Sequence, residues 1–301
     1  MSASVLFDSP GPRARRRYRL LTVVGSVVIL AIAWAVVARF AAKGQLTAAM
    51  WKPFLDPSTW VDYLLPGLVN TLEAAALSII LAAIFGLVFG VGRLSRNTAI
   101  RWVSSVVVEF FRSVPVLLMM VFAFFTYVET GIVPNDLAPL AGAVTGLTLY
   151  NGSVLAELVR SGVHGLPAGQ REAGLSIGLT EGQTLRNILL PQALTAMLPA
   201  LIGQLVVVVK DTALGYQILF TELLTQAKTL GSARGNTIPS YIVAAVLFII
   251  VNYTLTWVAG RVQHRVARRG ITTHGTHGPQ TAVVATAGPP TTTAPDAPGR
   301  R

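Results

Sequence analysis

The sequence predicts an all-α integral membrane protein with about six transmembrane helices. Hydrophobic residues make up 52% of the 301-residue chain and charged residues only 12%, whereas charged residues are about a quarter of a soluble domain. Several apolar blocks reach the roughly 20 residues that a helix needs to cross a bilayer. The net charge is +11, and the basic residues gather at the ends of these blocks, as the positive-inside rule describes. These three observations define the fold class.

The first apolar block follows a basic start. Residues 1–19 carry five arginines among prolines and glycines, which indicates a cytoplasmic tail. The apolar run 20–40 is longer than the core of a signal peptide, which has about 7–15 residues, and Arg39 lies where a cleavage site would be expected. We therefore expect a first transmembrane helix and, after it, an aromatic-rich external segment, together covering residues 20–65.

Five further apolar blocks form the predicted transmembrane core, residues 66–265. The loop after the first of these blocks carries Arg93 and Arg96 and is expected inside, whereas 129–139 has two acids and no Lys or Arg and is expected outside. Both chain termini then lie in the cytoplasm. The blocks are 66–94, 102–128 with an interruption at 112–115, 140–158, 193–209 and 241–260, and a polar external stretch with short helices is expected at 210–240.

Gly86 and Gly90 form a small-xxx-small face on the block 66–94, which favours close packing against another helix.

The C-terminal residues 270–301 are rich in Thr, Pro, Gly and Ala and lack apolar periodicity, so we expect a disordered cytoplasmic tail. His274 and His277 lie there, but two histidines supply too few ligands for a metal site. The chain has no cysteine, which excludes disulfides and Cys-ligated metals. We predict neither a metal nor a cofactor in this chain.

The segment 167–191 is the longest reach without an apolar span, and we expect it to form two short amphipathic helices at the membrane surface. Pro167 breaks the preceding segment, Gly178 and Gly182 interrupt the helical pattern, and Pro191 closes it. Such a loop between two spans is suited to docking against something outside the bilayer. Leucines four apart give each short helix one apolar face, namely Leu175 with Leu179 and Leu185 with Leu189.

In the same segment, Glu172-Ala173-Gly174 is followed after three residues by Gly178 and after nine more by Ile188-Leu189-Leu190-Pro191. This pattern resembles the "EAA" loop of ABC importer permeases. That family usually has Ala as the third residue of the triplet, where this chain has Gly174, another small residue. The resemblance implies a cytoplasmic coupling helix that sits in a groove of an ATPase subunit, with Glu172 as the polar contact and Gly178 shaping the bend. The coupling residues that it implies are Glu172, Ala173, Gly174, Gly178, Ile188, Leu190 and Pro191.

Several further motifs are spread along the transmembrane core, namely Asn70-Thr71-Leu72, Phe111-Arg112-Ser113-Val114-Pro115, Ala156-Glu157-Leu158-Val159-Arg160 and Lys210-Asp211-Thr212-Ala213-Leu214. Together they are similar to the polar amino acid permeases of the histidine/glutamate/glutamine uptake group, most of all to actinobacterial glutamate permeases of the second-subunit type. This resemblance covers about residues 66–265. Ser113 stands where that group more often has Gly.

This resemblance implies the type I ABC importer permease fold and ATP-driven import of polar amino acids, with glutamate preferred. It also implies three protein partners in a bacterial plasma membrane: an ATP-binding cassette ATPase that holds ATP and Mg, a second permease subunit, identical or paralogous, and an extracellular solute-binding protein. The chain would be a multi-pass protein in contact with the lipid bilayer. It would not be an enzyme, because ATP hydrolysis would take place on the partner chain.

Ionisable residues at membrane depth are costly and by default indicate function. A zwitterionic substrate needs a cation for its carboxylate and an acid for its ammonium group. The alternative is structural, because Glu109 and Glu157 each lie three residues before an arginine and so share a helical face with it. The candidates for the substrate pathway are Arg112, Glu157, Lys210 and Asp211.

Several other functions find less support. No Gly-Lys dipeptide occurs, so the chain has no Walker A loop. The basic residues are not interleaved with aromatic residues on a soluble face, which argues against nucleic acid as a partner. The segment 174–178 fits the G-x-S-x-G elbow of hydrolases, but that motif needs a strand before Ser176, and the preceding segment is a broken loop. A channel or secondary transporter that uses Glu157 or Asp211 remains the alternative.

Overall fold

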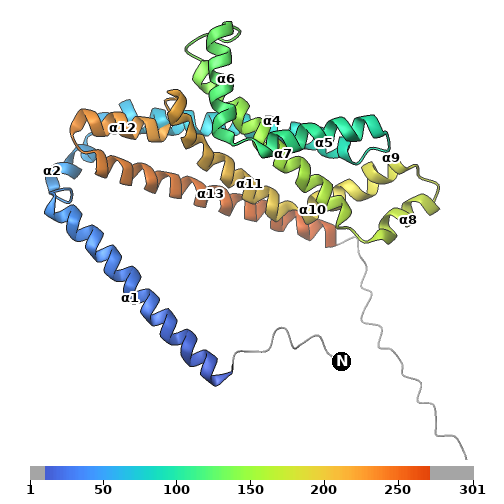
Figure 1. The fold of residues 1–301 in the computed structure, drawn as a ribbon, viewed down its shortest axis with the longest axis horizontal. Helices are drawn as coiled ribbons and strands as arrows, with labels where there is room; N and C mark the ends of the chain where they lie inside the picture. The colour runs from blue at the N-terminus through green and yellow to red at the C-terminus, as the bar shows by residue number, and fades with distance from the viewer. Residues whose placement is uncertain (1–10, 272–301) are drawn as a thin grey trace, which may run out of the picture.

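The computed structural model describes residues 11–271, and its regular elements within this range are all helical. The long helices lie roughly along one axis of the molecule, with the exceptions described below (Figure 1). The long elements are α1 (Pro12–Ala42), α4 (Leu65–Arg93), α5 (Thr98–Ser113), α6 (Val116–Thr130), α7 (Ala138–His164), α11 (Leu198–Asp211) and α13 (Thr237–Ile271).

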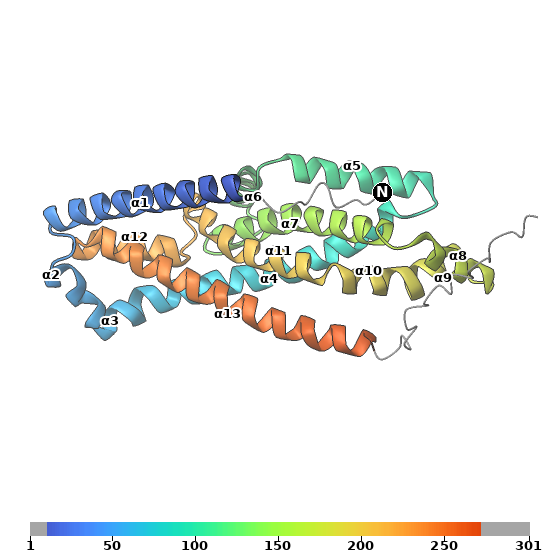
Figure 2. The ribbon, with the colours of Figure 1, turned by 90° about the horizontal axis from the view of Figure 1, so that it is seen from below.

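The short elements form three groups between the long ones. Those that follow α1 and those that follow α11 meet at one end of the molecule, and those that follow α7 lie at the other (Figures 1 and 2). The groups are α2 (Ala48–Trp51), η2 (Lys52–Leu55), α3 (Pro57–Thr59) and η3 (Trp60–Leu64); then α8 (Ala168–Ser176), α9 (Glu181–Thr184), η4 (Leu185–Leu189) and α10 (Leu190–Ala196); and η5 (Thr212–Ile218) with α12 (Leu223–Arg234).

Helices α4 and α7 pack closely along an extensive contact in the core. A Cβ added at Gly86 would lie 2.5 Å from the Cβ of Leu155, and one at Gly90 would lie 2.9 Å from that of Val159. Gly152 of α7 in turn accommodates the ring of Phe85. Small residues thus let the two backbones approach closely, as the Gly86/Gly90 spacing predicts, and dispersion contacts stabilise the pair.

Within residues 11–271, four helical segments are long and apolar enough to cross a membrane, and the bent pair α5–α6 could be a fifth. Helix α7, which includes the predicted span 140–158, is not one of them. Its middle carries Asn151, Gly152 and Ser153, all buried against other helices. Because the protein, and not lipid, surrounds this helix, its sequence does not need the apolarity of a lipid-facing span. The four segments are Arg13–Ala42, Pro57–Arg93, Leu198–Ile218 and Thr237–Arg261.

The predicted span 102–128 is two helices, α5 and α6, bent by 100° at the predicted interruption. Pro115 lacks an N–H group and directly precedes the first residue of α6. Val114 before it is extended, with φ −86° and ψ 129°, as proline imposes on its predecessor. Figure 1 shows α6 pointing away from the long axis that α5 follows. The predicted interruption at 112–115 is therefore present, as a sharp bend between two helices.

The predicted span 193–209 differs from the observed apolar helical segment at both ends. A break at Met197 separates α10 from α11, and the apolar helical segment runs on to Ile218 through η5. Helices at 212–218 and 223–234 confirm that the polar stretch 210–240 contains short helices.

Helix α1 stands apart from the bundle. It diverges from the other helices in Figure 1, and its apolar side chains are exposed, with Trp34 at 75% and Ile29 at 68%. The helix starts at Pro12, so the arginines of the predicted tail 1–19 belong to its first turns. Residues 1–10 lie outside the described range. Most of the predicted tail 270–301, with His274 and His277, also lies outside it, and residues 270 and 271 end α13.

One end of the bundle is fastened by the start of α4. The hydroxyl of Thr71 accepts a 3.1 Å hydrogen bond from the Leu223 N–H, and the Asn70 amide donates to the carbonyl of Thr221 at 2.8 Å. Glu222 lies between these partners, fully buried, and caps α12 by accepting from the N–H groups of Leu224 and Thr225. Burial raises the pKa of the Glu222 carboxyl. The Asn70-Thr71 motif therefore holds the segment between α11 and α13 against α4.

Candidate coupling loop and charge network

The loop after α7 folds as helix, glycine turn, helix, as the sequence predicts. Helix α8 ends in a Schellman motif: the Gly178 N–H donates to Leu175 O at 3.0 Å and the Leu179 N–H donates to Gly174 O at 3.2 Å. Gly178 has φ +86°, in the left-handed region that favours glycine. The backbone thus reverses at this residue, and Leu179 lies beyond the turn. The predicted apolar stripe of Leu175 and Leu179 on one helix is therefore wrong.

We call α8 the first arm of the loop and the helical run from α9 through η4 to α10 the second arm. The second arm is a longer helical run than the sequence predicts. Thr180 and Gln183 form a capping box at the start of α9, with hydrogen bonds of 3.3 Å and 2.8 Å. Gly182 lies in the first turn of α9 and does not interrupt it. Pro191 does not close the helix either, because the π-helical turn η4 precedes it and α10 continues to Ala196. A π turn shifts the backbone hydrogen bonds by one residue and so accommodates the missing N–H of proline.

Gly174 is the contact between the two arms. A Cβ added there would lie 2.7 Å from Cγ2 of Thr184 and 3.0 Å from Cδ1 of Ile188. Thr184 is itself fully buried. The third residue of the triplet therefore has space for hydrogen alone, unless Thr184 moves.

The predicted coupling residues include both buried and exposed positions of this loop. Three of them face inward: Gly174 is buried, and Ile188 and Leu190 are half-buried. The sequence interpretation missed Ile177, whose side chain is 75% exposed at the end of α8 and is the most prominent apolar group of the loop. The exposed members of the predicted set are Glu172, Ala173, Gly178 and Pro191.

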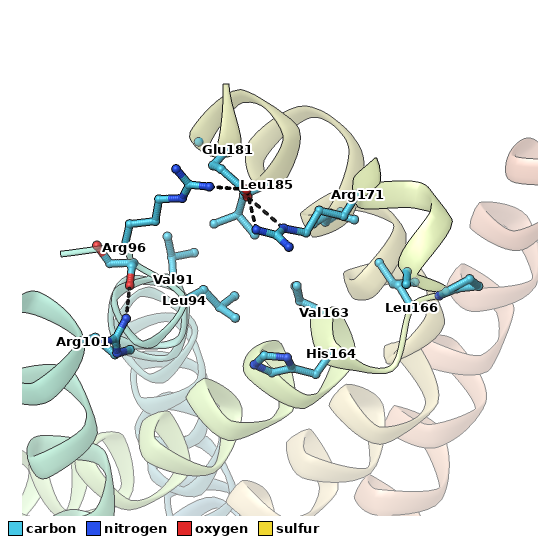
Figure 3. A pocket seen from close by; sticks show the side chains of 15 residues that line it. Val91, Leu94, Arg96, Arg101, Val163, His164, Leu166, Arg171, Glu181 and Leu185 are labelled. Carbon is cyan, nitrogen blue, oxygen red and sulfur yellow. Dashed lines mark hydrogen bonds and ion pairs between the residues drawn. The ribbon is translucent and has the colours of Figure 1, made fainter. Parts of the chain in front are cut away.

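Glu181 joins the loop to the end of α4. Its carboxylate accepts hydrogen bonds from Arg171 of α8, at 2.9 Å from Nε, and from Arg96 between α4 and α5 (Figure 3). The hydrogen bond from Arg171 lowers the pKa of Glu181 below its ordinary value, and the Arg96 guanidinium acts in the same direction. The sequence marks Arg96 as part of a basic cytoplasmic loop, and the spacing along the chain does not reveal that it meets Arg171 and Glu181.

Ser176 does not occupy a nucleophile elbow. It is the last residue of helix α8, and its hydroxyl donates to the carbonyl of Glu172 one turn earlier, at 2.9 Å. A helix therefore precedes Ser176 where the motif requires a strand. This geometry gives no support to a hydrolase.

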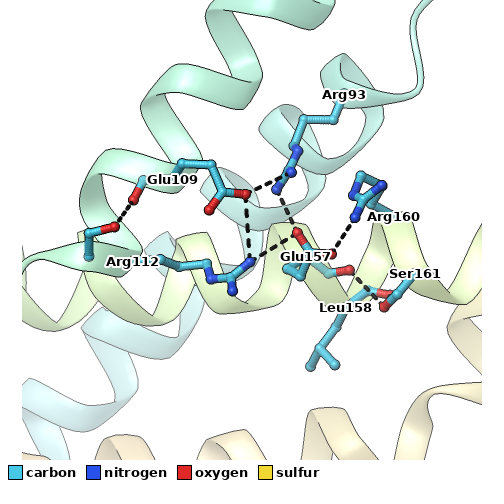
Figure 4. A network of polar contacts seen from close by, with 8 residues as sticks. Arg93, Glu109, Arg112, Glu157, Leu158, Arg160 and Ser161 are labelled. Carbon is cyan, nitrogen blue, oxygen red and sulfur yellow. Dashed lines mark hydrogen bonds and ion pairs between the residues drawn. The ribbon is translucent and has the colours of Figure 1, made fainter.

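A second charged cluster connects three helices (Figure 4). Arg93 of α4 donates to Glu109 of α5 at 2.9 Å and to Glu157 of α7 at 2.7 Å, and only 7% of its side chain is exposed. Arg112 donates to Glu157 at 3.0 Å, and Arg160 donates to the other oxygen of the same carboxylate at 2.8 Å. Three guanidiniums thus surround one carboxylate. We name these five residues the Arg93 network.

The sequence leaves open whether Glu109 and Glu157 pair with the arginines three residues after them. The self-pairing of Glu109 with Arg112, at 3.8 Å, and of Glu157 with Arg160 does occur. The sequence did not predict Arg93 as the centre, because it assigned this residue to the topology of a loop. A positive residue at the end of an apolar span, combined with two acids at membrane depth, was the signal that could have indicated the contact.

Lys210 and Asp211 lie elsewhere, at the last turn of α11. Their side-chain atoms are 3.9 Å apart, and Lys210 is 70% exposed while Asp211 is 17% exposed. Within residues 11–271, neither of them bonds to a member of the Arg93 network. The four predicted pathway residues thus fall into two separate pairs.

Between these pairs, Asn151 and Gln204 join α7 to α11. The Gln204 amide donates to the Asn151 carbonyl oxygen at 2.6 Å, and the Asn151 amide donates to Leu147 O at 2.9 Å. Asn151 is fully buried. Buried amides at this depth are satisfied by each other, as a membrane interior requires.

Comparison with known proteins shows the family to which this architecture belongs. A family model described as the binding-protein-dependent transport system inner membrane component matches residues 78–268. The chain belongs to this family. The match spans α5, α7, the coupling loop and the Arg93 network, and it confirms the predicted all-α membrane permease fold. Helix α1 lies outside the matched range.

Individual relatives of this permease agree with the family. It is 44% identical over 224 residues to the glutamate transport system permease protein GluD of Corynebacterium glutamicum, covering 74% of this chain and 82% of the relative. It is 37% identical over 206 residues to the probable glutamine ABC transporter permease protein GlnP of Bacillus subtilis, covering 67% and 93%. Among solved structures, the "Crystal structure of an amino acid ABC transporter with histidines" matches with a TM-score of 0.63 and 25% identity over 70% of this chain and 98% of that one.

Proposed function

We propose that this permease is a membrane subunit of an ATP-driven importer for polar amino acids, with glutamate as the preferred substrate. The 44% identity to a glutamate transport permease over most of both chains carries this proposal. A second relative is named for glutamine, so an amino acid with a carboxylate and a polar side chain is common to both names.

The coupling loop is the surface that an ATPase partner would engage. Ile177 offers an exposed apolar side chain and Glu172 an exposed carboxylate, both on the same short helix. An apolar anchor with a charged neighbour is suited to a docking contact, because burial of the anchor provides affinity and the charge fixes orientation. In this proposal ATP and Mg bind to the partner, and this chain holds no cofactor.

The transport mechanism is a change of access driven from that surface. The Gly174–Thr184 contact makes the two arms of the loop one unit, and this unit continues into α7 on one side and into α10 on the other. The Arg93 network ties the same end of α7 to α4 and α5. A displacement of the loop would therefore move these helices together and would expose the substrate path to the other side.

The substrate path in this proposal uses Lys210 and Asp211 first. The Lys210 ammonium is exposed and pairs with Asp211 only at 3.9 Å, so it is available for a substrate carboxylate. Arg112 and Glu157 bond to each other, and they would contact substrate only if the network opened. Both termini lie in the cytoplasm in this proposal, since arginines precede the apolar part of α1 and other arginines, beginning with Arg261, follow the apolar part of α13.

A second permease subunit completes the pore, and an extracellular solute-binding protein delivers the substrate. The test is the initial rate of labelled glutamate uptake in cells that lack this gene, with and without complementation, in the presence of excess unlabelled aspartate, glutamine, histidine or arginine. The expected result is uptake that the gene restores, that acidic amino acids suppress and that depletion of ATP abolishes. Uptake that persists without ATP and follows an ion gradient would overturn the proposal in favour of a secondary transporter.

A further inference from the structure

A cavity of about 650 Å³ lies between the coupling loop and the ends of α4 and α7 (Figure 3). Its volume is in the range of ordinary ligand pockets. One part of its wall is apolar, and side chains from all of these elements contribute to it. This apolar wall consists of Val91, Leu94, Val163, Leu166, Leu185 and Leu189.

The rest of the wall is strongly cationic. Arg96, Arg101, Arg171 and His164 line the cavity, and Glu181 is the one carboxylate among its lining residues. Glu181 accepts from Arg96 and Arg171 together. Within residues 11–271, the Arg101 guanidinium bonds only to neutral oxygens, the Ser95 carbonyl at 3.2 Å and the Thr98 hydroxyl at 3.4 Å. The lining residues therefore carry excess positive charge, and Arg101 contributes a cation that has no carboxylate partner in the described part of the chain.

The position of the cavity suggests the source of a ligand. It begins at the last turn of α4, where the apolar segment Pro57–Arg93 ends. At such a boundary a bilayer presents phosphate headgroups directly above acyl chains. A small polar anion would satisfy the guanidiniums but would leave six apolar side chains against water, whereas an anionic amphiphile satisfies both parts of the wall.

We propose that this cavity binds an anionic phospholipid of the adjacent leaflet. The phosphodiester lies against Arg96 and Arg101, and the glycerol and upper acyl chain lie along the apolar wall from Val91 to Leu94 and Leu166. Basic pockets between helices at a membrane surface are suited to such headgroups. Because Arg96 also bonds to Glu181, the lipid contacts one partner of the ion pair that joins the coupling loop to the end of α4.

The test uses the intact transporter, purified with its partner subunits in mild detergent and depleted of lipid. Dioleoylphosphatidylglycerol and dioleoylphosphatidylcholine are titrated separately, and native mass spectrometry counts the lipids retained on the permease. The expected result is retention of phosphatidylglycerol in preference to phosphatidylcholine. Arg101→Gln should weaken the affinity for phosphatidylglycerol roughly fivefold, the contribution of one charge near a membrane surface, and Arg101→Lys should retain most of it.

Arg186→Gln is the matched control, because Arg186 is an exposed arginine of the coupling loop that does not line the cavity. It should bind phosphatidylglycerol as the wild type does. Equal retention of the two lipids by the wild type would overturn the proposal without any variant. So would a loss in Arg186→Gln as large as in Arg101→Gln, since it would indicate a diffuse surface charge. Displacement of the lipid by equimolar inorganic phosphate or glutamate would assign the cavity to a small anion and would also overturn it.

Discussion

Arg93, at the end of α4, donates a 2.7 Å hydrogen bond to Glu157 of α7, although 64 residues separate them in the chain. The same guanidinium reaches Glu109 of α5. One nearly buried side chain therefore joins three helices at the coupling-loop end of the bundle.

The first prediction concerns this arginine. Arg93→Gln should lower the stability of the permease by about 2 kcal/mol, because it removes two charge-assisted hydrogen bonds from a side chain that is 7% exposed. Glu109→Gln should cost less than about 1 kcal/mol, since Glu109 is 54% exposed. The apparent unfolding temperature of the purified protein in detergent measures both. Equal shifts for the two variants would contradict the central place of Arg93.

The second prediction concerns the backbone at Gly178. Gly178→Val should impair transport while leaving membrane insertion intact, because a β-branched residue at φ +86° is strained. Among residues 11–271, no atom lies within 4 Å of a Cβ added there, so the effect within this chain comes from the backbone conformation and not from a steric clash. Uptake is measured against the amount of protein in the membrane.

Gly182→Val is the matched control for this experiment. Gly182 also has no atom near an added Cβ, but it lies in the first turn of α9 without a positive φ. It should tolerate the substitution far better than Gly178. Wild-type uptake by a well-expressed Gly178→Val protein would show that the turn is not needed.

The third prediction concerns the contact between the two arms of the loop. Gly174→Ala places a methyl group 2.7 Å from Cγ2 of Thr184 and should reduce transport. Thr184→Ala should restore much of the activity when it is combined with Gly174→Ala, because it removes Cγ2 and the hydroxyl of Thr184, two of the three atoms nearest to the new methyl, and leaves only the end of the flexible Ile188 side chain. The Thr184 hydroxyl is buried without a hydrogen-bond partner within residues 11–271, so its removal costs no hydrogen bond. Additive losses in the double variant would reject the steric explanation.

The fourth prediction is a pH dependence at Glu181. Its pKa is lowered in the folded protein from an ordinary value of 4.5. The ion pairs with Arg171 and Arg96 therefore contribute fully above pH 4.5 and are lost as the pH falls through the depressed pKa. The difference in apparent unfolding temperature between wild type and Glu181→Gln should be present at pH 7 and should disappear in acid. A difference that does not change with pH would assign the effect of the substitution to packing.

The sequence predicted what depends on local pattern. The Gly86/Gly90 spacing indicated a close helix contact, Gly178 indicated a turn, and Pro115 indicated the break between α5 and α6. Each of these residues acts on its own backbone or its own helix face. The break was predicted, but its angle was not, because α7 determines where α6 packs.

Other features depended on partners far away in the chain. Arg93 meets Glu109 and Glu157 only because α4 and α7 run side by side, and a single sequence gives no register between helices. Pro191 was wrongly expected to end a helix, because a π turn before it is not visible in residue spacing. The apolarity of α7 falls short of a lipid-facing span for a similar reason: its neighbours replace lipid, and they are known only once the bundle is assembled.

Ile177 stands at the far end of α8, a nine-residue helix of about 13 Å, and this position has a mechanical consequence. A force applied to Ile177 is transmitted to two places, the end of α7 and the helical run that starts at Glu181. Gly174 lies directly against Thr184, so the two arms cannot be compressed toward each other. The force then becomes torque on the bundle and is not absorbed as bending of the loop. In the proposed mechanism, the stiffness of this contact, which depends on the absence of a methyl group at Gly174, determines how much of a displacement by the partner reaches the membrane helices.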